Sequence, residues 1–472
     1  MSIRALGKQS LIYGIGHMMA RLITFLLLPL YTHSFTQEEY GALSLAYAFM
    51  GFTLILYRYG MDTALMKYSV QTSGQERTKH ITAIIISQLI TSVIFTAILY
   101  VSRFTIANWV LGIDRPDWMA FLAIILFLDS LWNLPLLILR SEEKAVPFIG
   151  FSLLNVVITM VLNILFVVQW GYGIEGVFKA NILASGIIFI LSLPIVIRRI
   201  QLHAFNKKVF NKILQFALPF LPAGLFTMVM ELSDRYLLEW LLGTADVGLY
   251  SAGKKMGMLG LTVVMGFNMG WTPYFLKRGK EEGAKIEFAK IATLFLGIMG
   301  YISVLVSIWM PEIMQLSVAG KTLIGSEFWA CEPVVSTILI GYFFFGTYVL
   351  QLPGVYMKEI TNWVPIFRII GAGTLIISSM YLIPAFGLIG AAYGVVLAFI
   401  AMSSAIYFKT HSLYPVRYNW RGIVFPVVFL AGIQVGIDGI WSKLAVSLLF
   451  PLLWYAIAIT DQEKDGLLRL LR

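Results

Sequence analysis

The chain has 472 residues, of which 59% are hydrophobic and 13% charged, and its mean hydropathy is +0.82. Soluble proteins are nearer a quarter charged, so this composition excludes an ordinary soluble protein and predicts a chain solvated by lipid. The net charge of +10 does not indicate nucleic-acid binding, because the Lys and Arg residues form short clusters between apolar runs. The single cysteine, Cys331, excludes an intramolecular disulfide, and no Cys/His cluster has metal-ligand spacing.

Runs of apolar residues long enough to cross a bilayer follow one another along the whole chain. A bilayer core about 30 Å thick needs roughly 20 apolar residues of helix. Fourteen such runs are predicted, at residues 10–32, 41–66, 81–101, 118–139, 148–168, 174–197, 213–240, 249–275, 288–310, 333–352, 363–383, 388–408, 422–437 and 444–460. The first is too long for the apolar region of a signal peptide, and no small-residue cleavage site follows it. The last two are the shortest.

The cationic residues predict the orientation of these spans. Clusters of Lys and Arg lie in alternate connecting segments, and the remaining connections hold only Arg103, Arg115, Lys321 and Lys443. By the positive-inside rule, the clusters are cytoplasmic, and so are both termini. All connections are short, which leaves no room for a separate soluble domain.

An internal repeat relates the first six spans to the next six. The segment from Tyr40 to Ser44, YGALS, matches the segment from Val247 to Ser251, VGLYS, at an offset of 207 residues. A second match, GIEGV from Gly173 against GLIGA from Gly387, has an offset of 214. Six helices per repeat give two lobes of the same orientation, related by an axis along the membrane normal, with a site between them. We therefore expect a lobe at residues 1–205, a lobe at 206–408, and a peripheral helix pair with a tail at 409–472.

Several motifs on these helices resemble those of the polysaccharide transporters, the O-antigen flippase type within the multidrug/oligosaccharidyl-lipid/polysaccharide exporter superfamily. The likeness covers the first twelve spans. Its carriers are the segments EEYG (residues 38–41), YGMDTAL (59–65), SDRY (233–236), VGLYSA (247–252) and NMGWTPY (268–274). The order of these motifs and their placement on the helices carry the resemblance.

The resemblance implies a function. Members of this kind have two six-helix lobes around a central cavity that opens alternately to each leaflet of the bacterial inner membrane. The implied substrate is an undecaprenyl-pyrophosphate-linked oligosaccharide, and a glycan polymerase of the same pathway is an implied partner. The relative that moves lipid II has cations on helices one, two and eight, and the matching positions here are Arg21, Arg58 and Lys254 or Lys255.

Cations inside the spans are the expected substrate ligands. An ionisable residue at the bilayer centre costs roughly 2.5 to 3.5 kcal/mol on insertion scales, so it is kept where it faces a cavity or a partner. Arg21 lies at the midpoint of the first span, and His17 lies one turn away on the same face. We expect both to line the cavity. The alternative for Arg21 is a structural pair with a buried carboxylate.

The second and eighth spans carry the other candidate ligands. Arg58 and Asp62 lie four residues apart, on one face of a continuous helix, where a structural pair and a ligand site are equally open interpretations. Arginine suits phosphate because its planar fork donates two parallel hydrogen bonds. Lys254 and Lys255 lie about two turns inside the eighth span, and one of them is expected only to snorkel to the outer interface.

Four carboxylates, Asp62, Asp129, Glu231 and Asp234, are candidates for coupling transport to H⁺ or Na⁺, the role that buried carboxylates usually have in membranes. Asp129 lies in the middle of the fourth span, near an expected turn at residues 133–135; the alternative is a neutral buried acid. Two of these carboxylates, Glu231 and Asp234, follow Pro219 and Pro222, which we expect to kink the seventh span. For Asp234, the alternative to ion coupling is a structural pair with a facing helix.

These observations predict alternating-access transport of an anionic lipid-linked glycan, with no metal or organic cofactor. A drug or cation antiporter of the same superfamily would need a cavity that is acidic on balance, and a lipid II-type flippase is a nearer alternative. A membrane glycan polymerase or ligase is expected to have a large outside loop with catalytic residues. The longest outside loop here, residues 311–332, has one lysine, Lys321, and no histidine, so we do not expect an enzyme.

Overall fold

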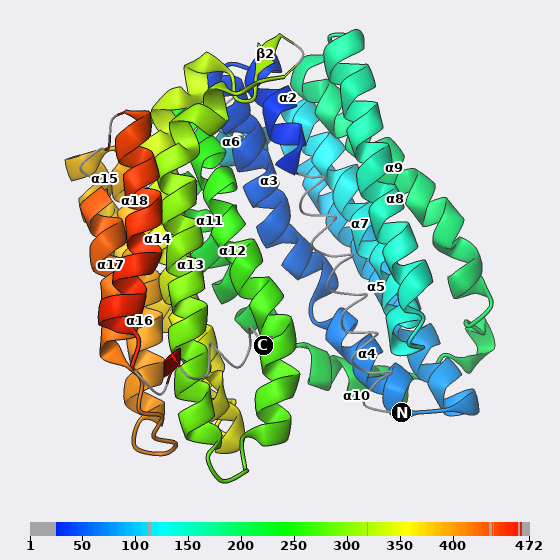
Figure 1. Ribbon diagram of the computed structural model, residues 1–472. Coiled ribbons are helices and arrows are strands. Elements are labelled where there is room, and N and C mark those ends of the chain that lie inside the picture. Colours follow the sequence, from blue (N-terminus) through cyan, green and yellow to red (C-terminus); the bar gives the residue numbers. More distant parts are fainter. Residues whose placement is uncertain are drawn as a thin grey trace. The chain divides into compact units, whose positions relative to one another are not determined.

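The computed structural model describes residues 25–111, 115–318, 320–433, 437, 439–460 and 463–464 (Figure 1). Within these ranges the chain is almost entirely helical, with one hairpin of two-residue strands. The chain divides into two compact units, Met1–Tyr236 and Leu237–Arg472. The predicted boundaries at residues 205 and 408 stay predictions.

The first unit contains ten α-helices, counting the greater part of α11, with two short helices of other kinds between them, among the residues described. The α-helices are α2 Leu27–Ser34, α3 Gln37–Arg58, α4 Met61–Gln71, α5 Gly74–Val101, α6 Arg103–Leu111, α7 Pro116–Ser141, α8 Ala145–Asn163, α9 Gly173–Ile197, α10 Lys207–Ala217 and α11 Phe220–Leu241. A π-helix, η1 Ile164–Gln169, extends α8, and a 3₁₀-helix, η2 Leu202–Ala204, precedes α10.

The second unit continues from the end of α11. Its α-helices are α12 Thr244–Arg278, α13 Ala284–Gln315, α14 Glu332–Met357, α15 Trp363–Phe386, α16 Leu388–Thr410, α17 Trp420–Ile433 and α18 Ile440–Leu453. Strands β1 Ser317–Val318 and β2 Lys321–Thr322 pair antiparallel between α13 and α14. The 3₁₀-helix η3 Ser326–Cys331 leads into α14, and the π-helix η4 Trp454–Ala458 extends α18.

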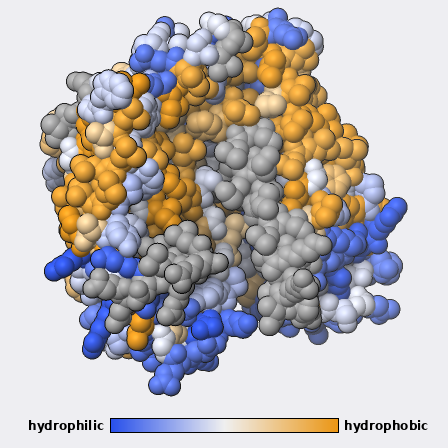
Figure 2. Space-filling model, viewed as in Figure 1, coloured by the Kyte–Doolittle hydropathy of each residue, from blue (hydrophilic) through white to orange (hydrophobic). Residues whose placement is uncertain are grey.

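The expected all-helical, multi-pass membrane fold is confirmed. Eleven helical runs in the described part of the chain are long and apolar enough to cross a membrane. Three predicted spans are not among these eleven. Most of residues 10–32 lies outside the described residues, α12 has 35 residues but is less apolar, and α17 has 14 residues. Figure 2 shows hydrophobic side chains along the helix sides of each unit and hydrophilic ones towards the helix ends.

The predicted repeat has a structural counterpart at the starts of α9 and α16. Gly173 and Gly387 lie at these starts with left-handed φ angles of 57° and 59°. Three residues later, a Cβ on Gly176 would lie 3.2 Å from the Phe166 carbonyl oxygen, and a Cβ on Gly390 would lie 2.0 Å from that of Leu382. Both glycines thus let a helix start pack against the backbone of the preceding helix. The GIEGV and GLIGA segments therefore form equivalent helix starts in the two units.

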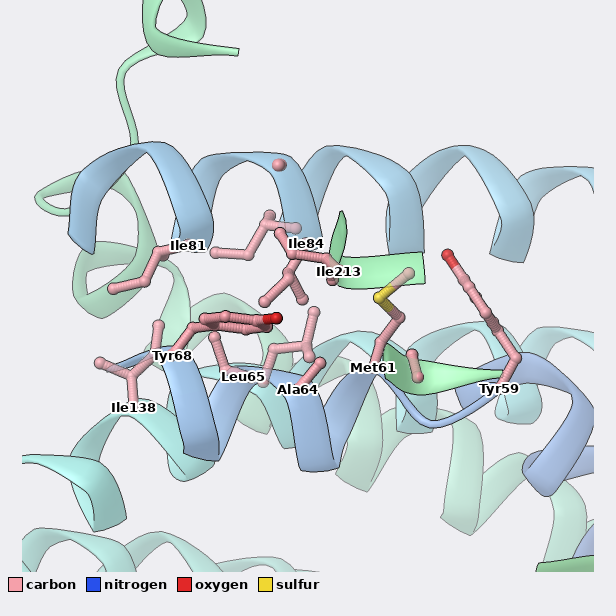
Figure 3. Close-up of a cluster of buried hydrophobic side chains, with 13 residues drawn as sticks. Tyr59, Met61, Ala64, Leu65, Tyr68, Ile81, Ile84, Ile138 and Ile213 are labelled. Atoms are coloured by element: carbon pink, nitrogen blue, oxygen red, sulfur yellow. The ribbon is translucent and has the colours of Figure 1, made fainter. Parts of the chain in front are cut away.

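A compact apolar core in the first unit fixes α4 in place (Figure 3). Met61, Leu65 and Tyr68 of α4 pack there with Ile84 of α5 and Ile213 of α10. Each of these side chains is at most 6% exposed, so they are in close van der Waals contact with one another. The core therefore holds α4 against α5 and α10 at the level where the chain leaves α3.

Candidate functional site

The second predicted span is broken where it carries its two charges. α3 ends at Arg58 and α4 begins at Met61, because Tyr59 and Gly60 have positive φ angles of 29° and 82°. The prediction that Arg58 and Asp62 share one face of a continuous helix is therefore wrong, since the chain leaves the helical path between them. The predicted span 213–240 is also two helices: α10 ends at residue 217, α11 begins at 220, and a proline lies between them.

Side chains from α5 stabilise the break at Tyr59. Ending a helix leaves backbone carbonyls without their usual partners. Gln88 donates a hydrogen bond from its Nε2 to the carbonyl oxygen of Tyr57 at 2.5 Å, in place of an N–H one turn later. The Tyr59 hydroxyl lies 2.5 Å from the Ser87 hydroxyl. Gln88 and Tyr59 are both buried, so the break is a fixed feature of the interior rather than a frayed helix end.

Gly60 is required at the break for two reasons. Its φ of 82° lies in the left-handed region, which costs other residues about 1 kcal/mol or more. A Cβ at this position would also lie 2.1 Å from the carbonyl oxygen of Ala217 in α10. The end of α10 therefore approaches the backbone of the break directly, and only glycine leaves room for it.

Asp129 lies opposite the break, on α7, and is held by two donors. Ser185 of α9 donates from its hydroxyl to Asp129 Oδ1 at 2.6 Å, and Trp132 donates from its indole Nε1 to the same oxygen at 2.8 Å. The expected turn at residues 133–135 is absent, because α7 stays helical through Pro135. Asp129 is thus oriented by α7 and α9 together.

The structure brings Arg58, Asp62 and Asp129 into one electrostatic cluster, which we call the Arg58 cluster. The Arg58 guanidinium interacts with both carboxylates, although no direct ion pair joins them within the described residues. Arg58 is partly exposed, but its Nε is buried without a hydrogen-bond partner in the described part of the chain. Asp62 lies in the first turn of α4, where its Oδ1 accepts the backbone N–H of Thr63 at 2.8 Å.

The charges of the Arg58 cluster depend on protonation. With both carboxylates ionised, one cation and two anions leave a net negative charge, and a proton on Asp129 makes the cluster neutral. No group of three or more His, Cys, Asp or Glu residues suited to a metal occurs among the described residues.

The remaining predicted carboxylates lie on α11. Asp234 is fully buried and accepts the backbone N–H of Arg235 at 3.0 Å. Glu231 is exposed and lies almost one turn earlier. The Tyr236 hydroxyl donates to the Leu45 carbonyl oxygen at 3.2 Å, which docks this part of α11 against α3.

The predicted lysine ligands lie in the second unit, on α12. Lys254 is only 5% exposed, and its Nζ lies 5.6 Å from the centre of the Tyr250 ring, while Lys255 is partly buried. The other predicted ligands, His17 and Arg21, lie outside the described residues. The assignments of all these side chains to substrate or coupling ion stay predictions.

Several polar residues of the first unit were missed by sequence reasoning. Ser185 and Trp132 hold Asp129, and Gln88 holds the break. Asn181, one turn before Ser185, donates from its Nδ2 to the Tyr47 hydroxyl at 2.7 Å and joins α9 to α3. The sequence does contain a signal for these residues, because each is an uncharged polar residue inside an apolar span. Periodicity alone does not say which helix such a residue faces.

The second unit also contains a cavity of about 250 Å³ between α13, α14, α16 and α17. Its lining is mostly apolar, and Thr347 and Ser403, whose hydroxyls lie 2.6 Å apart, lie on its wall. None of the candidate site residues that the structure describes lines this cavity.

Comparisons with known proteins agree with this architecture. Residues 6–278 match a family described as polysaccharide biosynthesis protein. An Lsg-locus protein of Haemophilus influenzae is 22% identical over 356 residues, which is 72% of this chain and 84% of that protein. A membrane protein of the same organism is 22% identical over 359 residues, or 72% of this chain and 83% of the relative.

Two solved structures share the fold. The lipid II flippase MurJ in an inward closed conformation matches with a TM-score of 0.73 at 14% identity, over 94% of this chain and 99% of that chain. A multidrug resistance MATE family transporter of the MOP superfamily, in an inward-facing conformation, matches with a TM-score of 0.65 at 15% identity, over 89% and 100%. Since the family match covers more than half of the 472 residues, the chain belongs to the polysaccharide biosynthesis protein family and has the fold of the MOP superfamily.

Proposed function

We propose that this protein is a flippase that moves undecaprenyl-pyrophosphate-linked oligosaccharide from the inner to the outer leaflet of the bacterial inner membrane by alternating access. The family match links the chain to polysaccharide biosynthesis, and the fold is that of a lipid II flippase and of MOP transporters. The observation that carries the proposal is Arg58, a cation at a break in a membrane-spanning helix with no direct ion pair in the described part of the chain. Such a cation is suited to a diphosphate.

In this proposal, Arg58 acts with Arg21, His17 and a lysine of α12, Lys254 or Lys255, on the pyrophosphate. The carboxylates inside the spans, Asp129 first, couple transport to H⁺ or Na⁺, because a carboxylate in a membrane span is costly unless it carries an ion or a partner. Both termini and the basic segment at 198–212 face the cytoplasm, as the positive-inside rule predicts. A glycan polymerase of the same pathway takes the product on the outer side.

One observation favours a second function, a drug or cation antiporter of the same superfamily. The Arg58 cluster is acidic on balance when both of its carboxylates are ionised, as a site for a cationic substrate would be. The MATE transporter shares the fold. The mid-membrane arginine argues against this function, because it repels a cation.

Deleting the gene separates the two functions. A flippase mutant accumulates the lipid-linked oligosaccharide, which is extracted from the membrane and identified by mass spectrometry, and it loses the surface glycan. Re-expression of the chain restores both. Normal lipid intermediates together with increased susceptibility to cationic drugs would reject the flippase and support the antiporter.

A further inference from the structure

α10 is an amphipathic helix whose two faces are cleanly separated. At about 100° per residue, its polar side chains fall within an arc of about 140°, and its apolar ones occupy the rest of the circumference. The polar face is formed by Lys207, Lys208, Asn211, Lys212 and Gln215, all exposed. A helix of this kind lies along an interface rather than across a membrane.

The apolar face of α10 is fixed to the end of two spans. Ile213 and Ala217 are fully buried in the core that α10 shares with α4 and α5, and Figure 3 shows Ile213 beside Ile84. The Phe216 ring packs edge-on to Tyr68 at 5.9 Å. Because α4 ends at residue 71 and α5 begins at 74, α10 lies near the level where these helices leave the membrane.

The exposed face of α10 belongs to a wider basic surface. Lys207, Lys208 and Lys212 form no ion pair within the described residues. Lys67 of α4 joins them, with its Nζ 3.7 Å from the centre of the Phe216 ring. Glu76 at the start of α5 interacts with Lys212, but it is already bonded at 2.8 Å to Lys79. These five lysines and one glutamate leave a large excess of positive charge.

Apolar side chains flank the lysines on both sides. Leu202 and Phe205 precede α10 and are 71% and 43% exposed, and Leu218 and Phe220 follow it at 46% and 41%. Exposed leucine and phenylalanine beside lysine suit a membrane surface, where the apolar groups enter the lipid and the lysines meet headgroups. A soluble phosphate would leave these apolar groups in water.

We propose that α10 binds the phosphates of anionic phospholipids, such as phosphatidylglycerol, in the leaflet that contains it. Lys207, Lys208 and Lys212 contact the phosphates, and Leu202 and Phe205 lie among the upper acyl carbons. The site would concentrate anionic lipid beside the break at Gly60, since the end of α10 contacts that glycine. This inference rests on the membrane fold and not on the proposed substrate.

The test measures lipid selectivity of the full-length chain. The protein is reconstituted in phosphatidylcholine vesicles containing trace spin-labelled phosphatidylglycerol or spin-labelled phosphatidylcholine, and the immobilised fraction of each label is compared. Each lysine near an anionic surface raises affinity about fivefold. We therefore expect a clear preference for phosphatidylglycerol, reduced at least tenfold in a K207Q/K208Q/K212Q variant and kept in K207R/K208R/K212R.

The matched control removes three exposed lysines of the second unit, as K277Q/K280Q/K358Q. It should keep the preference. Equal loss of the preference in this control would overturn the proposal, because a general charge effect would then explain the selectivity. An unchanged preference in the K207Q/K208Q/K212Q variant would also overturn it. Competition by soluble glycerol phosphate at millimolar concentration would also overturn it, because the site would then bind free phosphate. Failure of transport in the same vesicles has no effect on these outcomes.

Discussion

Arg58 is the residue on which the substrate proposal depends most directly among those described. Arg58 is the last residue of α3. The carboxylates of Asp62 and Asp129 interact with it electrostatically, but neither forms a direct ion pair with it. An arginine that served only as the partner of an acid would be expected to form that pair. We therefore propose that the guanidinium fork binds a diphosphate.

We expect Arg58→Ala to abolish glycan export while the protein inserts and folds, because the substitution removes a charge that is costly in the membrane. Arg58→Lys should keep partial activity, since the point charge remains and the bidentate fork is lost. Arg115→Ala, which removes a 56% exposed arginine of the same unit, is the control and should export normally. Normal export by a well-expressed Arg58→Ala protein would contradict the assignment.

Asp129 is the carboxylate that we propose for ion coupling, because it lies inside a membrane-spanning helix and is held by donors from α7 and α9. In an Asp129→Asn variant, the amide oxygen can still accept from Ser185 and Trp132, so the fold should be kept. The amide cannot take up a proton or pair with a cation. In proteoliposomes, we expect the parent protein to respond to an imposed proton or sodium gradient and the Asn variant to lose that response. A parent that ignores both gradients would remove the coupling idea.

At the scale of elements, the junction between α3 and α4 is the feature most sensitive to substitution. Any other residue at position 60 would have to adopt a left-handed backbone conformation. Its Cβ would also lie 2.1 Å from the Ala217 carbonyl oxygen. We expect Gly60→Ala to lower the free energy of unfolding by about 3 kcal/mol or more. Gly74→Ala is the control that isolates the cost of the backbone conformation. Gly74 has a φ of 56°, but nothing lies within 4 Å of the position that its Cβ would take. We expect this variant to lower the free energy of unfolding by only about 1 kcal/mol.

Both Gly60 and Gly74 variants are compared by thermal unfolding in detergent. Equal unfolding temperatures for the two would mean that α10 does not approach the break as described.

A second junction joins α5, α7 and α9 through Glu142. Arg199 donates to both carboxylate oxygens at 2.7 Å, Arg77 donates at 3.2 Å, and Lys144 donates at 2.9 Å. The hydrogen bonds from Arg199 lower the pKa of Glu142 from 4.5 to about 2. Because the folded pKa is the lower one, this stabilisation is complete above about pH 4.5 and is lost as the pH falls towards 2.

We therefore expect Glu142→Gln to lower stability by about 2 to 3 kcal/mol at pH 7 and by progressively less below pH 4.5. Unfolding temperatures at pH 7 and pH 3.5 check this, with Glu143→Gln, at a neighbouring position, as the control. A Glu142→Gln deficit that is the same at both pH values would show that ionisation is not its cause.

At the scale of the whole molecule, the fold could be predicted well from the sequence, because a segment that crosses lipid must be apolar, of a set length and internally hydrogen-bonded. Span length and apolar character decide where helices cross, and the repeated segments at Gly173 and Gly387 correspond to equivalent helix starts. The interruptions were harder to predict. Pro135 lies inside a continuous helix, whereas the chain breaks at Gly60, where no proline is present.

The candidate site was predicted only in part, for a related reason. A charge inside an apolar span is visible in the sequence, so Arg58, Asp62 and Asp129 were found. Their neighbours Ser185 and Gln88 come from other helices, and local periodicity does not reveal which helices pack together. The break also moves Asp62 away from its expected position on the Arg58 face, which only the backbone at Tyr59 reveals.

The central claim is that this protein flips a lipid-linked glycan, and reconstitution tests it most directly. Proteoliposomes are loaded with undecaprenyl-pyrophosphate-linked oligosaccharide, and a membrane-impermeant glycosidase added outside reports the fraction of glycan that is accessible. With the parent protein, we expect that fraction to rise well above the share in the outer leaflet of protein-free liposomes, and with Arg58→Ala it should stay at that share. An accessible fraction equal to that of protein-free liposomes, from parent protein shown to be folded and inserted, would contradict the account.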